Sequence, residues 1–255
     1  MNGYPIFIRY ADRLKELGIQ TFLPNMNQFR LRGKDKLVQI AENIGLRIPR
    51  TAVLTSDEML FEALGRIGTP LMVKGIYYEA HRANTHAEAI LQYRKLVAQW
   101  GYPIVAQEIV NGDELNVIGL GDGDGNVLGL LGMKKVALTS LGKVWSGVTV
   151  DHPVMMQAAQ RFVEEYCWKG PFELECIISN DDVHLIEINP RFPAWVYFAT
   201  ACGINLPTTM LRQSLGMRQK PLATYEPGKL LVRYSYDYVA DMNTLQNLVT
   251  SGETL

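Results

Sequence analysis

The sequence has few cysteines, no long apolar run and no export signal. Its three cysteines, Cys167, Cys176 and Cys202, are widely spaced and include no Cys-x-x-Cys pair, which argues against a disulfide framework and a zinc site. The longest nearly uncharged apolar run, Phe192 to Ile204, is shorter than the roughly 20 residues of a membrane-spanning helix. The N-terminus lacks the basic-then-apolar pattern of a signal peptide. We therefore expect a protein of the reducing cytoplasm, without a membrane partner.

The chain also lacks an excess of charge of either sign. Lys and Arg total 25 against 26 Asp and Glu, so the net charge is -1 and no strong field attracts nucleic acid. The 255 residues, 47% of them hydrophobic, suffice for one large core or two small ones. These values predict a globular protein whose partner is a small molecule.

The order of the predicted elements favours an α+β fold with two lobes and antiparallel sheets. Helical spacing of apolar residues predicts seven helices, over residues 4–17, 34–43, 56–64, 87–100, 153–166, 195–202 and 208–215. β-rich runs predict strands over residues 19–23, 48–53, 70–74, 104–110, 114–120, 127–133, 172–179, 183–188 and 229–238. Residues 75–84 and the segment around residues 134–152 are expected to be irregular.

Two glycine-rich signals and the histidines do not indicate sites. Gly119 to Gly123 resembles a dinucleotide loop, but its third glycine is one position off and a strand follows. Asp122 to Asn126 resembles the start of an EF-hand loop, but Val127 stands where that loop needs glycine. We expect a hairpin turn here. The four histidines show no pairing at ligand spacing.

Acidic residues interrupt an otherwise apolar hairpin near residue 180. Alternation places Glu173 and Glu175 on one face of its first strand, and Glu187 and Asn189 on one face of its second. Carboxylates so close repel each other unless a cation lies among them, and Mg²⁺ prefers oxygen ligands. Arg191, on the same face, would contact a phosphate or a carboxylate. The alternative is a solvated strand face.

The segment Glu-Ile-Asn-Pro-Arg, with Glu175 twelve residues before Glu187, resembles the metal-binding hairpin of the ATP-grasp ligases. The similarity is greatest to the biotin carboxylase and carbamoyl-phosphate synthase branch. Three further segments resemble this family in the same order: Gly33 to Thr51, Pro70 to Lys74, and Gln107 to Glu114. The resemblance implies a two-lobed ATP-grasp fold with the nucleotide between the lobes.

The resemblance also implies roles for individual residues. Lys36 and Lys74 would contact ATP, and Glu114 would hold the ribose hydroxyls. The hinge residues Gln107, Glu108, Ile109 and Val110 would line the adenine, with the backbone of Glu108 and Val110 facing its edge. Glu175, Glu187 and Asn189 would bind Mg²⁺, or Mn²⁺ in its place, with Arg191 nearby. A lysine at the end of a strand, such as Lys74, is also common as a solvated strand end.

Four domains follow from this resemblance. Residues 1–33 are interpreted as the remnant of an N-terminal domain that is mostly lacking, 34–106 as the first lobe, 107–217 as the second lobe with the metal hairpin, and 218–255 as an extension. We expect a homodimer, or a partner chain that supplies the N-terminal domain. The loop after Lys74 has one glycine, Gly75, where many relatives are glycine-rich, so side chains such as Arg82 would cover the phosphates.

The resemblance implies an ATP-dependent ligase that joins a small carboxylate to an amine, an amino acid or peptide substrate, through an acyl phosphate. Two alternatives remain open: a bicarbonate-phosphorylating enzyme of the same superfamily, and a nucleotide-binding subunit without turnover. Lys134 and Lys135 would add positive charge to the site, or they form a solvated basic turn. The aromatic run Phe192 to Phe198 is either core packing or a wall of the acceptor pocket.

Overall fold

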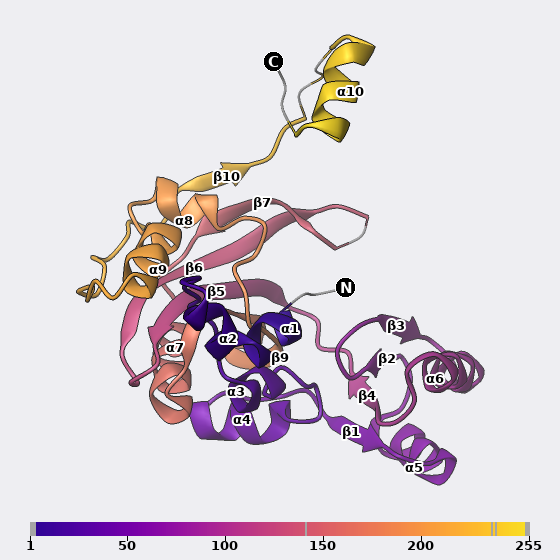
Figure 1. Cartoon of the computed structure of the whole chain (residues 1–255). Helices are drawn as coiled ribbons and strands as arrows, with labels where there is room; N and C mark the ends of the chain where they lie inside the picture. The colour runs from indigo at the N-terminus through magenta and orange to yellow at the C-terminus, as the bar shows by residue number, and fades with distance from the viewer. Residues whose placement is uncertain (1–3, 141, 236, 238, 253–255) are drawn as a thin grey trace.

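The computed structural model describes residues 4–140, 142–235, 237 and 239–252. It has two lobes, each built on one antiparallel sheet (Figure 1). The smaller sheet has four strands in the order β1-β4-β2-β3, and the larger has six in the order β10-β7-β6-β5-β8-β9. The two-lobed α+β architecture expected from the sequence is therefore present.

The small lobe packs two helices against its sheet. The strands are β1 (Thr51–Leu54), β2 (Leu71–Gly75), β3 (Ala80–Ala83) and β4 (Ile104–Glu108), and the helices are α5 (Asp57–Ile67) and α6 (His86–Trp100). Ser56 and Thr85 cap the two helices through their side-chain hydroxyls, which satisfies free backbone N–H groups. Leu60, Leu71 and Leu96, each at most 1% exposed, belong to the apolar core between the helices and the sheet.

The large lobe covers one face of its sheet with two helices. Its strands are β5 (Asp113–Asp122), β6 (Val127–Leu138), β7 (Val144–Thr149), β8 (Lys169–Ser179), β9 (Asp182–Asn189) and β10 (Leu230–Val232). The helices α4 (Leu37–Ile44) and α7 (Pro153–Tyr166) join the core formed by Phe172, Leu174 and Leu185. Helix α4, which the sequence assigned to the first lobe, thus packs in the core of the second.

The opposite face of the large sheet is apolar at one end and polar at the other. Helices α8 (Tyr197–Ala201) and α9 (Leu206–Ser214) contribute to a second core, together with Ile118 and Leu131 of the sheet. Leu222, Tyr225 and Leu231 pack against this core, so part of the expected C-terminal extension belongs to the large lobe. Towards the small lobe the same sheet face carries acidic side chains instead.

The connection between the lobes runs from β4 to β5 through Ile109 to Gly112. A Cβ atom at Gly112 would collide with the backbone carbonyl of Ile178, so only glycine permits this close approach to β8. The connection is therefore held against the strand that carries Glu173 and Glu175.

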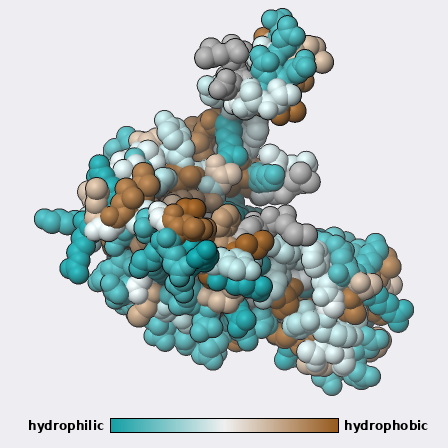
Figure 2. Space-filling model, in the orientation of Figure 1, coloured by the Kyte–Doolittle hydropathy of each residue, from teal (hydrophilic) through white to brown (hydrophobic). Residues whose placement is uncertain are grey.

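The remaining helices lie at the ends of the chain. They are α1 (Tyr4–Arg9), α2 (Ala11–Glu16), α3 (Met26–Arg30) and α10 (Met242–Thr250). Helix α10 projects from the body of the molecule (Figure 1). In the described part of the chain no helix is long and apolar enough to cross a membrane. Hydrophilic and hydrophobic residues are mixed over the face seen in Figure 2.

The structure corrects several predicted elements. The helix expected over residues 4–17 is two helices, the strand expected over 19–23 has no regular pairing, and the last strand covers only 230–232, with residues 236 and 238 outside the described part. Strands β3 and β7 occupy segments expected to be irregular, and α3 and α10 were not predicted. Short strands such as β3 (Ala-His-Arg-Ala) have no alternating apolar pattern, since partner strands supply their stability.

We predict that Phe162→Ala lowers the free energy of unfolding by about 3–5 kcal/mol. Phe162 is 0% exposed, and its ring centroid lies 4.9 Å from that of Trp168 and 5.3 Å from that of Phe172. Urea unfolding followed by tryptophan fluorescence measures the change. The matched control is Phe61→Ala, because Phe61 is 58% exposed and its loss should cost less than about 0.5 kcal/mol. Equal losses in both variants would contradict this account of the core.

Candidate functional site

The polar end of the large sheet brings together the acidic residues of the β8–β9 hairpin. Glu175 pairs with Glu187 across the two strands, and Glu173 pairs with Asn189. All four lie on the face opposite the α4–α7 core, as the alternation in the sequence predicts. The amide Nδ2 of Asn189 donates to Glu175 Oε1 at 2.8 Å and to Glu173 Oε2 at 3.2 Å.

Lys135 of β6 neutralises part of this acidic charge. Its Nζ donates to Glu175 Oε2 and to Glu114 Oε2, each at 2.9 Å, and its side chain is 8% exposed. Burial opposes the charge, but the carboxylates of Glu175 and Glu114 raise the pKa of Lys135 overall. Lys135 therefore lies in the site rather than in a solvated turn. Lys134 points elsewhere, to Asp113 Oδ2 at 2.6 Å, with its side chain 38% exposed.

The small lobe contributes Lys74 from β2. This lysine is 6% exposed, and its Nζ donates to Gln107 Oε1 of β4 at 2.6 Å. Burial, together with the nearby charge of Lys34, lowers the pKa of Lys74 to about 8, while Glu187 and Glu175 oppose the shift. Lys74 thus interacts electrostatically with carboxylates of the other lobe, and it is not a solvated strand end.

Lys34 is a second lysine at the junction, which the sequence reasoning missed. It is 5% exposed, and its Nζ lies 3.4 Å from both Glu187 Oε1 and the carbonyl oxygen of Tyr77. Lys36, the residue singled out from the sequence, has its Nζ 3.2 Å from Asp35 Oδ2, and its side chain is 58% exposed. The resemblance could not separate two lysines that are only two positions apart.

The hinge residues occupy the strand end and loop between the lobes. Gln107 is 3% exposed, and its Nε2 donates to Thr51 Oγ1 at 3.0 Å. The carboxylate of Glu108 binds the guanidinium of Arg50 through two oxygens, and hydrogen bonds from Arg50 lower the pKa of Glu108. Ile109 and Val110 follow in the half-buried connecting loop. The backbone N–H of Glu108 donates to the carbonyl oxygen of Arg50 at 2.9 Å.

A cavity of about 580 Å³ adjoins the acidic hairpin. Its walls include Asn116, Lys135, Glu173, Glu175, Arg191 and Trp195, together with Lys143 and Arg233. Trp195 is 4% exposed and belongs to the second core of the large lobe. Core packing, the first of the two expected roles of the aromatic run, is thus present, and Trp195 also forms part of the cavity wall.

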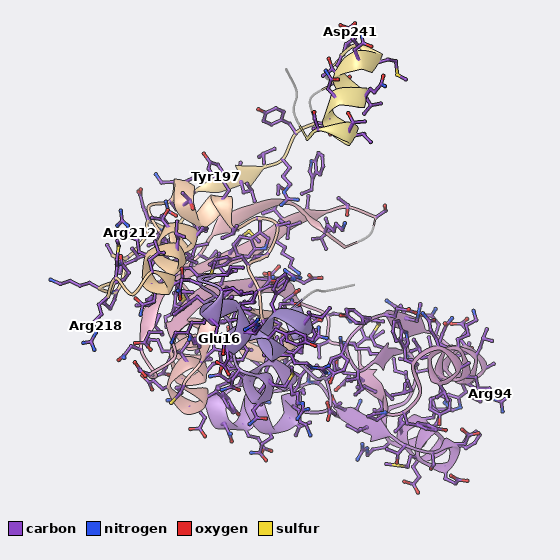
Figure 3. All side chains as sticks on the ribbon, in the orientation of Figure 1. Glu16, Arg94, Tyr197, Arg212, Arg218 and Asp241 are labelled. Carbon is purple, nitrogen blue, oxygen red and sulfur yellow. The ribbon has the colours of Figure 1, made fainter. Side chains whose placement is uncertain are left out.

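Two arginines bring positive charge to this cavity. The Nη1 atom of Arg191 lies 3.6 Å from Glu173 Oε2, and the Nη2 atom of Arg233 donates to the carbonyl of Ala194 at 2.6 Å. Arg233 was not found from the sequence, because it follows β10, which reaches the large sheet only by pairing with β7. Arg94 and Arg218, which are labelled in Figure 3, lie at the periphery, away from the junction of the lobes.

The loop that follows Lys74 carries two tyrosines, Tyr77 and Tyr78, whose rings contact Arg32. The guanidinium carbon of Arg32 lies 4.4 Å from the ring centroid of Tyr77 and 5.4 Å from that of Tyr78. The backbone N–H of Lys34 donates to the carbonyl of Ile76 at 3.2 Å. Arg82, expected to cover phosphates, donates instead to Asn84 Oδ1 at 2.9 Å. The loop is thus fastened to residues 32–34 of the neighbouring segment.

The oxygen atoms of the hairpin side chains are suited to a divalent cation that has additional ligands from outside the protein. In the described residues no three His, Cys, Asp or Glu side chains form a metal cage of their own. Two carboxylates in register and one amide oxygen supply part of an oxygen shell, and Mg²⁺ commonly completes such a shell with water and phosphate oxygens. With the buried ammonium groups of Lys34 and Lys74, the junction can bind a polyphosphate together with its cation.

Comparisons with known proteins agree with this geometry. The family model described as "ATP-grasp in the biosynthetic pathway with Ter operon" matches residues 102–236. The carbamoyl phosphate synthase large chain of Pseudomonas syringae pv. tomato is 23% identical over 207 residues, which cover 76% of this chain and 19% of that protein. The chain thus spans about a fifth of the length of this curated relative.

Solved structures share the fold. The biotin carboxylase domain of Hydrogenobacter thermophilus 2-oxoglutarate carboxylase, in complex with MgADP, ADP and bicarbonate, has a TM-score of 0.70 and 16% identity, covering 84% of this chain and 52% of that one. N5-carboxyaminoimidazole ribonucleotide synthetase from Thermus thermophilus has a TM-score of 0.68 and 18% identity, covering 90% and 63%. D-alanine–D-alanine ligase from Bacillus anthracis, complexed with ATP, has a TM-score of 0.61 and 18% identity, covering 80% and 74%.

We predict that the stability difference between Lys74→Met and the wild type depends on pH. Folding lowers the pKa of Lys74 from 10.5 to about 8, so below pH 8 the folded wild type holds a buried cation that the unfolded chain keeps in water. This penalty, on the order of 3 kcal/mol, disappears as pH rises from 8 to 10.5. The variant should therefore gain stability relative to the wild type at pH 7, and lose that gain at pH 10.

Urea unfolding of both proteins at the two pH values measures this difference. Lys95→Met, at an exposed position of α6, controls for the loss of a lysine as such. A stability difference between Lys74→Met and the wild type that is the same at both pH values would show that the Lys74 ammonium is not desolvated.

Proposed function

Because the chain belongs to the ATP-grasp family, we propose that it is a Mg²⁺- and ATP-dependent ligase that activates a carboxylate for attack by an amine. The carboxylate becomes an acyl phosphate, with ADP as the second product, and the amine then displaces phosphate to form a C–N bond. An amino acid or a peptide is the proposed substrate class.

The observation that carries this proposal is the meeting of opposite charges from the two lobes. The small lobe supplies the buried ammonium of Lys74, and the large lobe supplies the carboxylates of Glu175 and Glu187, whose charge affects the pKa of Lys74. Lys34 joins them, 3.4 Å from Glu187. A polyphosphate with a divalent cation satisfies both sets of charge at once, because its oxygens bind the lysines and the cation binds the acids.

We assign the nucleotide to the hinge between the lobes. In this proposal Gln107, Glu108, Ile109 and Val110 line the adenine, and the carboxylate of Glu114 receives the ribose hydroxyls. Lys74 and Lys34 hold phosphate oxygens, and Lys36 contributes its charge from the adjacent end of α4. The half-buried hinge loop, which directly follows the strand that carries Gln107, supports this placement.

Glu175, Glu187 and Asn189 are the proposed ligands of Mg²⁺, for which Mn²⁺ can substitute. When bound, the cation neutralises charge on the phosphates during phosphoryl transfer. The residues of the chain orient the reactants: Lys74, Lys34 and Lys135 stabilise negative charge, and Arg191 faces the carboxylate to be activated. Lys134, the other lysine considered for the site, is paired with Asp113 and is not assigned a role in this proposal. Positioning and electrostatics thus account for the chemistry, and no side-chain nucleophile is required.

The cavity beside the hairpin is the proposed carboxylate site. Arg191 and Arg233 lie in its wall, and guanidinium groups bind carboxylates with directional hydrogen bonds. Phosphorylation of bicarbonate is the second candidate, because one structural neighbour was crystallised with bicarbonate and the curated relative is a carbamoyl phosphate synthase. The volume of about 580 Å³ exceeds what bicarbonate fills and favours a larger acid.

We further propose a cytoplasmic location and a second protein surface against the N-terminal helices. The three cysteines are free thiols, as expected in a reducing compartment. Ile6, Phe7, Tyr10 and Leu17 are each more than half exposed, so apolar area in α1 and α2 is available for a second copy or for a partner chain.

We predict that Glu187→Gln weakens the binding of ATP in the presence of Mg²⁺ by at least about tenfold, because an amide replaces a charged ligand of the cation. Isothermal titration measures the affinity, with EDTA samples run in parallel. Glu164→Gln, on the exposed side of α7, is the matched control and should bind as the wild type does. Unaltered Mg²⁺-dependent binding in Glu187→Gln would contradict the proposed metal site.

A second prediction concerns the carboxylate. A screen of amino acids, peptides and bicarbonate by ADP release first identifies a substrate, and a folded wild type that binds ATP but releases no ADP with any of them would favour a binding subunit. With the substrate in hand, Arg233→Met should raise its KM by about tenfold, or 1.4 kcal/mol, and leave ATP affinity unchanged. Arg218→Met, at the periphery in Figure 3, is the control. Equal KM values in both variants would exclude Arg233 from the carboxylate site.

A further inference from the structure

A third carboxylate, Glu173, lies between the proposed metal ligands and the cavity. It is 2% exposed although it carries a charge in its ionised form, and it forms part of the cavity wall. Neither the ribose nor the metal requires it in the function proposed above. A buried acid of this kind is costly unless its surroundings satisfy it, so its partners indicate what it does.

Four N–H donors converge on the two oxygens of Glu173. Oε1 accepts from Asn116 Nδ2 at 2.7 Å and from Trp195 Nε1 at 3.2 Å. Oε2 accepts from Asn189 Nδ2 at 3.2 Å, and Arg191 Nη1 lies 3.6 Å away. Oε1 thus contacts Asn116 and Trp195, and Oε2 contacts Asn189 and Arg191.

The contact with Asn189 fixes which end of its amide is available. Its nitrogen donates to both Glu173 and Glu175, and carboxylates accept hydrogen bonds but cannot donate them when ionised. A reversed amide would place its oxygen against two acids. The oxygen, the only amide atom that binds Mg²⁺, is therefore not the atom used in the contacts with Glu173 Oε2 and Glu175 Oε1.

The contacts with Trp195 and Arg191 act on the cavity. Trp195 is the largest buried side chain of that wall, and its indole N–H would be unsatisfied without Glu173. Arg191 has one further contact, from Nη1 to the carbonyl of Phe192 at 3.4 Å. Glu173 thus connects a proposed metal ligand with two residues that face the proposed substrate.

We propose that Glu173 is a positioning residue that orients the amide oxygen of Asn189 toward the metal and holds Arg191 and Trp195 in the wall of the substrate cavity. This assignment rests on the proposed function, because it presupposes the metal and the carboxylate in these places. Substitution of a residue that hydrogen-bonds to a metal ligand commonly lowers metal affinity or activity by 10–100-fold.

Glu173→Gln tests the proposal with little change in shape. In this variant an NH₂ group replaces one of the two carboxylate oxygens. Whichever oxygen is replaced, one pair of neighbours loses its acceptor: Asn189 with Arg191, or Asn116 with Trp195. Isothermal titration measures the affinity of each protein for ADP, once in EDTA and once with Mn²⁺. The ratio of the two affinities, called the gain from Mn²⁺ below, is then compared between variants.

We expect Glu173→Gln to bind ADP in EDTA as the wild type does and to reduce the gain from Mn²⁺ by about tenfold. Glu173→Asp, which keeps the negative charge, should retain more of the gain from Mn²⁺ than Glu173→Gln does. Glu226→Gln, which removes an exposed acid paired with Lys229, should retain all of it. Thermal unfolding of each protein, without ligand, separates loss of fold from loss of orientation.

The outcomes distinguish this inference from the function on which it rests. A wild type without any gain from Mn²⁺ overturns the proposed metal site and, with it, the role of Glu173. A wild type with the gain, together with folded Glu173→Gln and Glu173→Asp variants that both retain it in full, overturns the role of Glu173 alone. If Glu173→Gln does not fold, Glu173→Asp decides: a reduced gain supports positioning, because the shortened carboxylate moves away from Asn189, and an unchanged gain overturns it.

Discussion

The register of the β8–β9 hairpin is the constraint on which the site depends. It places Glu175 opposite Glu187 and Glu173 opposite Asn189, on a face that is otherwise apolar where α8 and α9 cover it. Like charges directly opposite each other on paired strands are destabilising. A shift by one residue would put these acids into the α4–α7 core, so the apolar residues Leu174, Leu185 and Ile188 hold the register that keeps the acids together.

Compensation of this acidic charge requires residues from distant parts of the chain. Lys135 comes from the neighbouring region of the large sheet, Lys34 from the loop before α4, and Lys74 from the small lobe. Their ammonium groups are themselves largely buried, and the depressed pKa of Lys74 shows that the carboxylates do not offset its desolvation in full. The two lobes therefore meet where buried ammonium groups lie near carboxylates, an arrangement found both at functional sites and in structural ion-pair networks.

The sequence was informative where local patterning decides the structure. Alternation alone placed Glu173, Glu175, Glu187 and Asn189 on one face, and the turn of Asn180 to Asp182 joined their strands. Lys34 could not be separated from Lys36, because which of two lysines in one loop turns inward depends on the β2–β3 loop, to which the backbone of Lys34 is bonded. Arg233 and strand β3 were beyond prediction for a similar reason: both owe their position to pairing with strands remote in sequence, not to their own composition.

Family resemblance and geometry constrain different parts of the function. In the proposed function, the lysines, the hinge and the acidic hairpin serve any reaction that begins with phosphoryl transfer from ATP, so they would not select one carboxylate. Selectivity must arise in the cavity wall, where Arg191, Arg233 and Trp195 lie beside the acidic hairpin. Because Asn116, Asn189, Arg191 and Trp195 all converge on Glu173, a substitution in that wall also affects the surroundings of Asn189, a proposed metal ligand. If Asn189 binds the metal and this wall binds the substrate, as proposed, substrate choice and metal geometry are coupled through one buried carboxylate.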